Sequence, residues 1–259
     1  MSLKRLKLYL TYFQLKIASV YYALGHRNPG KKHRAVPLSR EPSYFRHKAA
    51  HPFHRMMPYL IPQFNEASCS VASVAAVLNA VNFLNDKTGV KTPITQAEIL
   101  ESVDAVHWKE RVSRKGHRNQ RGLTLEMLGI AVDKTLEVYH IAYAMVDVVA
   151  LHPKMNDFER RKEELKQRLI IFEESQNAFL IAHFNQGIFT GDLHLPHISP
   201  VGAYDHEKDR VLIMDVDPDQ PEPYWVPFEM FFEGISSDFY GILEKYGYPS
   251  GGYVWILLQ

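Results

Sequence analysis

Hydrophobic positions recur every three or four residues at the start of the chain, which is the period of an amphipathic α-helix. The stripe ends before Gly25, a helix-stop residue, and consists of Leu3, Leu6, Leu10, Phe13, Ile17, Val20 and Leu24. The basic residues of this segment fall on other sides of the helix. Residues 1–25 are therefore predicted to form a basic amphipathic helix. Through residues 3–24 it would contact a membrane surface, its own domain or a second copy in a homodimer.

The next region, residues 26–55, is rich in proline, histidine, arginine and lysine and has no clear period, which predicts a linker or a wrapping arm. Residues 56–259 form the predicted globular part. Helices are expected from about Cys69, after Thr95, after Thr124 and over 157–175. Strands are expected over 136–144, 178–184, 197–204, 210–216 and 253–258. Helices first and closely spaced strands later predict an α+β fold with a largely antiparallel sheet.

Composition narrows the classes of function. The 259 residues carry a formal net charge of +1, which gives no reason to expect nucleic acid as a partner. The one cysteine, Cys69, excludes both an internal disulfide and a multi-cysteine metal site. Two histidine pairs, His51 with His54 and His194 with His197, lack a third clustered ligand, so no metal site is predicted.

A lone cysteine is more often a buried core residue than a reactive one, so its context decides. Cys69 opens the predicted helix, where the helix dipole and unpaired backbone N–H groups favour the thiolate form. Gln63 precedes it by six residues, and its side-chain amide can join the Cys69 backbone N–H in an oxyanion hole. This context favours a nucleophile.

A histidine and an aspartate complete the candidate site. His197 opens one strand-like run and Asp215 ends the next, with a polar turn between them. If the two runs pair as a hairpin, the carboxylate lies beside the imidazole, fixes its tautomer and stabilises its charged form. His197 follows Cys69 by close to the roughly 130–150 residues typical of papain-like enzymes. Cys69, His197, Asp215 and Gln63 are the candidate catalytic residues.

These residues and their neighbours resemble the phytochelatin synthase family, a papain-like group that acts on glutathione. The resemblance implies a nucleophile at Cys69, a histidine at His197, an aspartate at Asp215 and an oxyanion glutamine at Gln63. The other matching pieces are Val71-Ala72-Ser73, Val77-Leu78-Asn79, Gly122-Leu123-Thr124, Ile198-Ser199-Pro200, Gly202-Ala203-Tyr204, Leu212-Ile213-Met214, Val216 and Trp225-Val226-Pro227. The sequence departs from the family at Ser70, Pro196 and Pro218, the last of which replaces a cation typical of the synthases.

The resemblance implies a glutathione γ-glutamylcysteinyl transferase and peptidase. Its thiolate would release glycine and form a thioester, resolved by water or by a second glutathione to give a phytochelatin. The chain resembles the short bacterial form, in which cleavage tends to dominate. No cofactor is required for acyl transfer, and cadmium or zinc would enter as an activator or as a metal–thiolate substrate.

Other readings stay open at this stage. Glutathione or a related small thiol peptide is the expected partner, and the same triad would also serve another γ-glutamyl or small peptide substrate. A non-catalytic relative that binds a membrane or a partner is the rival from another class. The expected location is cytoplasmic, with peripheral membrane attachment as an alternative and the periplasm less favoured.

Overall fold

A seven-stranded antiparallel sheet forms the centre of the protein in this computed structural model, which describes residues 3–25, 35–47, 52–85, 92–175 and 177–259. The strands lie in the order β1-β6-β5-β4-β3-β7-β2, and neighbouring strands are antiparallel throughout the described sheet. Their bounds are β1 Val36–Pro37, β2 Tyr143–Leu151, β3 Ala178–Asn185, β4 Pro196–Asp205, β5 Arg210–Ile213, β6 Tyr224–Pro227 and β7 Gly251–Leu258. The antiparallel α+β prediction is confirmed.

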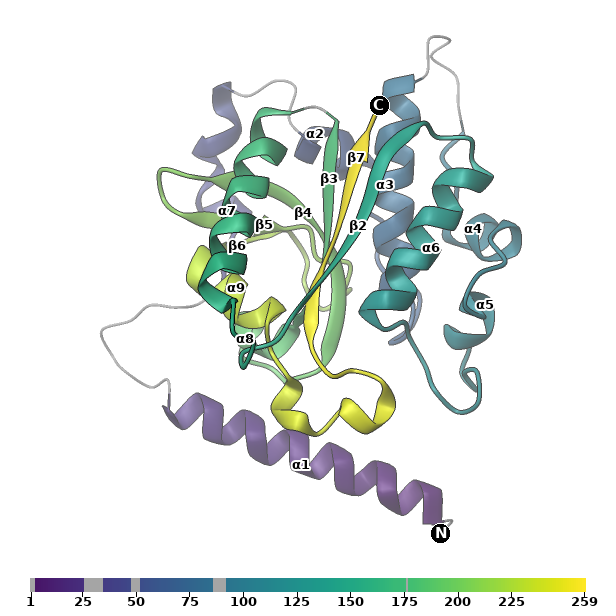
Figure 1. Cartoon of the computed structure of the whole chain (residues 1–259), viewed down its shortest axis with the longest axis vertical. Helices are drawn as coiled ribbons and strands as arrows, with labels where there is room; N and C mark the ends of the chain where they lie inside the picture. The colour runs from purple at the N-terminus through teal and green to yellow at the C-terminus, as the bar shows by residue number, and fades with distance from the viewer. Residues whose placement is uncertain (1–2, 26–34, 48–51, 86–91, 176) are drawn as a thin grey trace.

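Helices cover both faces of this sheet (Figure 1). One layer contains α2 (Pro52–Met56), α3 (Cys69–Asn85), α4 (Gln96–Ser102), α5 (Trp108–Arg111) and α6 (Leu125–Val138). The other contains α7 (Phe158–Glu174), α8 (Gln186–Thr190) and α9 (Phe228–Ile235). Strands buried on both faces explain why β3 is buried along its whole length. Each layer closes its own hydrophobic core against the sheet.

Several predicted element ends are confirmed by their capping contacts. Thr95 and Glu98 form the expected capping box at α4, each accepting a hydrogen bond from the other's backbone. The Thr124 side chain accepts a hydrogen bond from Met127 N at the start of α6. Helix α3 begins at Cys69 as predicted, so the thiol stands at a helix N-terminus.

The strand predicted over 136–144 is wrong. Helix α6 continues to Val138 because Leu136 and Thr135 are buried on the same face as Leu128 and Val132. His140 then takes a left-handed backbone conformation (φ 54°) and ends the helix, and β2 starts only at Tyr143. Short apolar runs do not separate a helix end from a strand start, and here two elements share one run.

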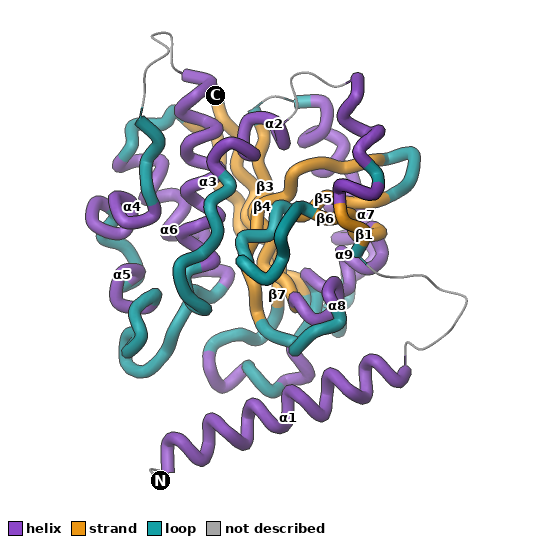
Figure 2. The backbone as a smooth tube through the Cα atoms, turned by 180° about the vertical axis from the view of Figure 1, so that it is seen from behind, coloured by secondary structure: helices purple, strands orange, loops and turns teal. Residues whose placement is uncertain are grey.

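The N-terminal helix α1 (Leu3–Gly25) lies along one end of the molecule, against the segment that precedes β7 (Figures 1 and 2). Thr11 Oγ1 lies 3.0 Å from Tyr246 Oη, and Leu15 is buried against Phe239 and Leu243. Residues 35–47 run beside the sheet, where β1 pairs with β6. Most of the residues between α1 and β1, and His51 of the histidine pair, lie outside the described residues.

Candidate active site

A tightly hydrogen-bonded turn presents Cys69 at the start of α3. Ser68 Oγ accepts hydrogen bonds from Phe64 N and Asn65 N, both at 3.0 Å. Asn65 Oδ1 accepts from Ala67 N at 2.8 Å, and its amide donates to Val112 O at 2.8 Å. The side chain of Cys69 is almost buried, with 8% of its surface exposed. A thiol held this way is fixed in position and open to the outside only over a narrow area.

Strands β4 and β5 form the predicted hairpin. His197 lies on β4, and Asp215 follows the last residue of β5, Ile213, by two positions. His197 Nε2 lies 2.7 Å from Asp215 Oδ1. Cys69 is hydrogen-bonded to the same imidazole, whose Nδ1 faces away from the carboxylate. Ser73 Oγ donates to both Cys69 O and Ile198 O, at 2.8 and 2.9 Å, and so fastens α3 to the strand that carries His197.

The electrostatics of the buried pair favour its charged form. Burial lowers the pKa of His197, but the Asp215 carboxylate and the Cys69 thiol outweigh it and hold that pKa well above its ordinary value. For Asp215, burial raises the pKa, while the imidazolium, Tyr224 and the backbone N–H of Asp217 together hold it below its ordinary value. An imidazolium in contact with a thiol is the setting in which thiolates form.

Gln63 reaches this site through its backbone. Gln63 N donates to Val216 O at 2.8 Å, directly after Asp215 in the chain. Its side-chain Oε1 is buried and has no hydrogen-bond partner among the described residues. The oxygen and nitrogen of an amide exchange places by a half-turn of the group. In that orientation Gln63 offers an unpaired donor, which is what an oxyanion hole requires.

Several contacting residues were not among the candidate catalytic residues of the sequence analysis. Tyr224 Oη donates to Asp215 Oδ2 at 2.5 Å, and Ser199 Oγ donates to Oδ1 at 3.3 Å. Tyr248 is half-buried and lies close enough to Cys69 for the thiol's charge to raise the Tyr248 pKa further, after burial itself. His183, on β3, is buried beside His197. Pairing within a sheet brings these residues together across distances that sequence spacing does not reveal.

The departures from the family pattern fit locally. Ser70 is buried, and its Oγ accepts a hydrogen bond from Trp108 Nε1 at 2.9 Å. Pro196 occupies the first position of β4, where a missing N–H is tolerated in a strand. Pro218 lies in a turn that Gln220 N closes on Asp217 O at 2.9 Å.

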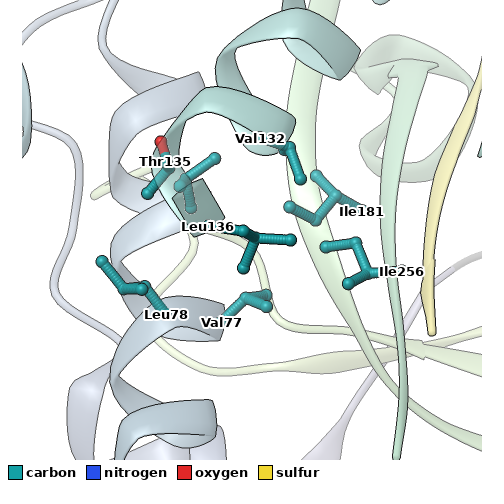
Figure 3. Close-up of a pocket in the computed structure, with 8 residues that line it drawn as sticks. Val77, Leu78, Val132, Thr135, Leu136, Ile181 and Ile256 are labelled. Carbon is teal, nitrogen blue, oxygen red and sulfur yellow. The ribbon is translucent and has the colours of Figure 1, made fainter. Parts of the chain in front are cut away.

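A small cavity lies in the core between α3, α6 and the sheet (Figure 3). Its lining is almost wholly aliphatic and includes Val77, Leu136, Ile181 and Ile256. None of the four candidate catalytic residues lines it. The cavity is therefore a packing defect of the core, separate from the thiol.

A thiol at a helix N-terminus, facing a histidine and an aspartate on an antiparallel sheet, is the arrangement of papain-like cysteine enzymes. Sequence comparison matches the phytochelatin synthase family over residues 43–238, which include all four candidate catalytic residues. The chain belongs to this family, as its sequence motifs indicated.

Curated relatives carry the same family's activity in their names. The chain is 27% identical to glutathione γ-glutamylcysteinyltransferase 1 of Arabidopsis thaliana over 188 residues. This alignment covers 71% of this chain and 34% of the plant protein. The chain is 26% identical over 190 residues to glutathione γ-glutamylcysteinyltransferase 1 of Triticum aestivum, covering 71% and 33%. The chain thus spans about a third of the length of these relatives.

Proposed function

We propose that this chain cleaves the Cys–Gly bond of glutathione through a thioester on Cys69. The observation that carries the proposal is the buried relay in which one imidazole contacts the Cys69 thiol and the Asp215 carboxylate. Family membership supports glutathione as the substrate, because the plant relatives are named for transfer of its γ-glutamylcysteinyl group.

The chemistry follows from the site. The Cys69 thiolate attacks the carbonyl carbon between cysteine and glycine, and the oxyanion forms against Cys69 N–H and Gln63. The C–N bond breaks as the His197 imidazolium gives its proton to the leaving amine of glycine. His197 then takes a proton from water, or from the free amino group of a second glutathione, as that nucleophile attacks the thioester carbonyl and the C–S bond to Cys69 breaks, which restores the thiolate. Asp215 holds the imidazole in place throughout.

No cofactor takes part in these steps. Cadmium or zinc enters the proposal as the metal of a glutathione thiolate complex or as an activator. One basic residue, Arg121, lies beside the turn that precedes Cys69: its Nη2 is 3.1 Å from Glu66 Oε2 and 3.4 Å from Asn65 Oδ1.

Incubation with glutathione, followed by quantification of glycine and γ-glutamylcysteine, tests the activity. Wild-type protein is expected to release glycine, and Cys69→Ala to release none. Asp217→Asn is the matched control, since it removes a neighbouring carboxylate that accepts from Gln186 Nε2 rather than from the imidazole. Glycine release by Cys69→Ala would refute the nucleophile. Repeating the assay with cadmium measures the balance of transfer against hydrolysis.

The proposed activation of the thiol and the proposed substrate are tested by different measurements. Iodoacetamide is expected to label Cys69 faster than free cysteine at neutral pH. Rapid labelling without glycine release would direct the same triad to another γ-glutamyl or small peptide substrate. Labelling no faster than free cysteine would instead favour a non-catalytic, binding role.

Helix α1 adds a proposed location, the anionic surface of a membrane facing the cytoplasm. Among the described helices, none is both long and apolar enough to cross a bilayer. The face of α1 opposite its contacts with the body exposes large apolar and aromatic residues without interruption by charge: Leu6, Tyr9, Leu10, Phe13, Ile17, Val20, Tyr21 and Leu24. A reducing cytoplasm also suits an enzyme that depends on one free thiol.

Charge selects a lipid surface over a second protein copy. Residues 3–25 contain four basic residues and no acidic one. Lys7 and Lys16 are exposed and flank the apolar face on its two sides, as in helices that lie in the headgroup region. Each cation near an anionic surface contributes about 1 kcal/mol, so Lys7 and Lys16 together favour anionic over neutral vesicles by roughly thirtyfold.

Sedimentation of the full chain with vesicles tests the location. Binding is expected with phosphatidylglycerol-containing vesicles and is expected to fall for the double variant Phe13→Ser, Tyr21→Ser. Phe83→Ser is the matched control, because Phe83 is an aromatic residue of similar exposure outside α1. Equal binding by all three proteins would contradict the proposal, and so would a dimer that the double variant converts to a monomer.

A further inference from the structure

We propose that His107, Glu110 and His117 form a binding site for a divalent transition-metal ion of the zinc type. One ligand atom from each of the three side chains lies within 4.8 Å of the others. The site includes none of the four candidate catalytic residues. It is thus independent of the proposed glutathione chemistry.

The three side chains lie close together. His117 Nδ1 lies 2.6 Å from Glu110 Oε2, and His107 Nδ1 lies 3.8 Å from Glu110 Oε1. The two imidazole rings stack with centroids 3.8 Å apart and planes 9° from parallel. Ligands of a tetrahedral zinc ion stand roughly 3.4 Å apart for bonds of about 2.05 Å. Because a metal ion lies in the plane of each imidazole that binds it, the stacked His107 and His117 rings must rotate, together with the exposed Glu110 side chain, before all three bind one ion.

Backbone hydrogen bonds fix the chain at all three ligands. His107 and Glu110 lie at the first turn of α5, where Arg111 N donates to His107 O at 2.9 Å. His117 closes a two-residue turn with Gln120 through backbone hydrogen bonds of 3.0 and 2.8 Å. The two residues inside that turn both have positive φ, as tight hairpin turns require. The backbone of the site is therefore fixed in advance of any ion, and only the three side chains must reorient.

The donor set selects the class of ion. Two imidazoles and one carboxylate suit zinc, nickel, cobalt or copper, whereas calcium and magnesium prefer oxygen ligands. Three protein ligands leave a fourth position for water or an anion. The histidines are ten positions apart, and only the turn after α5 brings His117 back to His107. That is why the sequence analysis predicted no metal site.

The surrounding charge predicts how the zinc affinity of this site depends on salt concentration. Between residues 107 and 122 the chain carries six basic residues and one acidic residue, Glu110. Diffuse binding of a cation to surface carboxylates weakens as salt screens the attraction. Here the neighbouring cations repel the ion, so screening strengthens binding. Affinity for zinc is therefore expected to hold or rise with ionic strength.

Calorimetric titration of the full-length Cys69→Ala protein with zinc tests the proposal without interference from the thiol. One ion per chain is expected. His107→Ala, His117→Ala and Glu110→Gln should each weaken binding more than about 100-fold, beyond the roughly 10–100-fold typical of outer-shell losses. His206→Ala is the control, since His206 is exposed elsewhere on the surface.

Cobalt provides a readout of coordination. Its visible absorption is expected to show a tetrahedral spectrum in the Cys69→Ala protein and to lose it in His117→Ala. Hydrogen exchange of the peptide over 111–121 should slow when zinc binds. Unchanged affinity in all three ligand variants, no binding in the Cys69→Ala background, or affinity that falls steeply with salt would each overturn the site.

Discussion

Replacing Asp215 with asparagine tests the electrostatics of the site directly. Oδ1 of Asp215 accepts hydrogen bonds from His197 Nε2 and from Asp217 N, at 2.7 and 2.9 Å. The amide oxygen of Asp215→Asn must take this position, because an NH₂ group there would face two donors. The His197 tautomer is therefore kept, and the variant removes charge while leaving the hydrogen bond.

The size of the effect follows from Coulomb's law. Two unit charges about 4 Å apart at an effective dielectric constant near 20 interact by about 4 kcal/mol. Loss of that interaction lowers kcat/KM at neutral pH by on the order of a thousandfold. The His197 pKa falls too, so the alkaline limb of the pH profile moves to lower pH.

The assay is glycine release from glutathione as a function of pH, for wild type, Asp215→Asn and the control Asp217→Asn. The control should keep the wild-type profile. A loss below about tenfold together with an unmoved alkaline limb would refute the charge argument. A loss of rate with that limb in place would leave the carboxylate with a purely structural role.

Stability should depend on pH through the same pair. The raised His197 pKa contributes stability that is complete below the unfolded pKa and is lost as pH rises through the folded one. The lowered Asp215 pKa contributes stability that is present above the unfolded pKa and is lost as pH falls through the folded one. The melting temperature of wild type minus that of Asp215→Asn is therefore largest between the unfolded pKa of the aspartate and the unfolded pKa of the histidine. A difference that does not vary with pH would contradict this linkage.

Three further substitutions test the site and its support. Gln63→Ala should lower kcat roughly 10²–10³-fold with little change in KM, measured by glycine release, if its amide faces the oxyanion; a change below fivefold would exclude that role. Ser73→Ala should lower the free energy of unfolding by about 1–3 kcal/mol in urea titrations, since it breaks the bond from α3 to β4. Leu136→Ala should reduce it by about 3–5 kcal/mol, because it enlarges an existing cavity; a loss under 1 kcal/mol would show that the site collapses.

Local rules predicted the parts of the fold that local interactions decide. The capping pairs at Thr95 and Thr124 and the helix from Cys69 need only neighbours in sequence, and all three are confirmed. The hairpin that joins His197 to Asp215 was also predictable, because a polar turn between two apolar runs fixes the pairing. The helix end at Val138 was not, since burial of one face on the sheet extended α6 through a strand-like run.

The supports of the site depend on contacts that no spacing encodes. Tyr224 reaches Asp215 from a different strand, and Trp108 reaches Ser70 from another helix. The histidine-glutamate cluster depends on two positive-φ residues, Arg118 and Asn119, in a turn whose sequence reads as an ordinary basic loop. Sequence thus identified the candidate catalytic groups, and the sheet determined which groups hold them in place.

His183 illustrates the difference and gives a last test. Both ring nitrogens are buried without a hydrogen-bond partner among the described residues, and burial followed by the His197 charge lowers the His183 pKa to about 3. A neutral, unpaired imidazole of this kind costs about 1–3 kcal/mol. His183→Phe keeps a ring against Tyr248 and Phe239 and should raise the melting temperature, by roughly 2–4 °C per kcal/mol. Calorimetry with glycine release separates the roles: higher stability with unchanged kcat/KM is expected, because a neutral ring contributes no charge to the relay. A gain in stability with a large loss of rate would instead show that the imidazole serves the reaction.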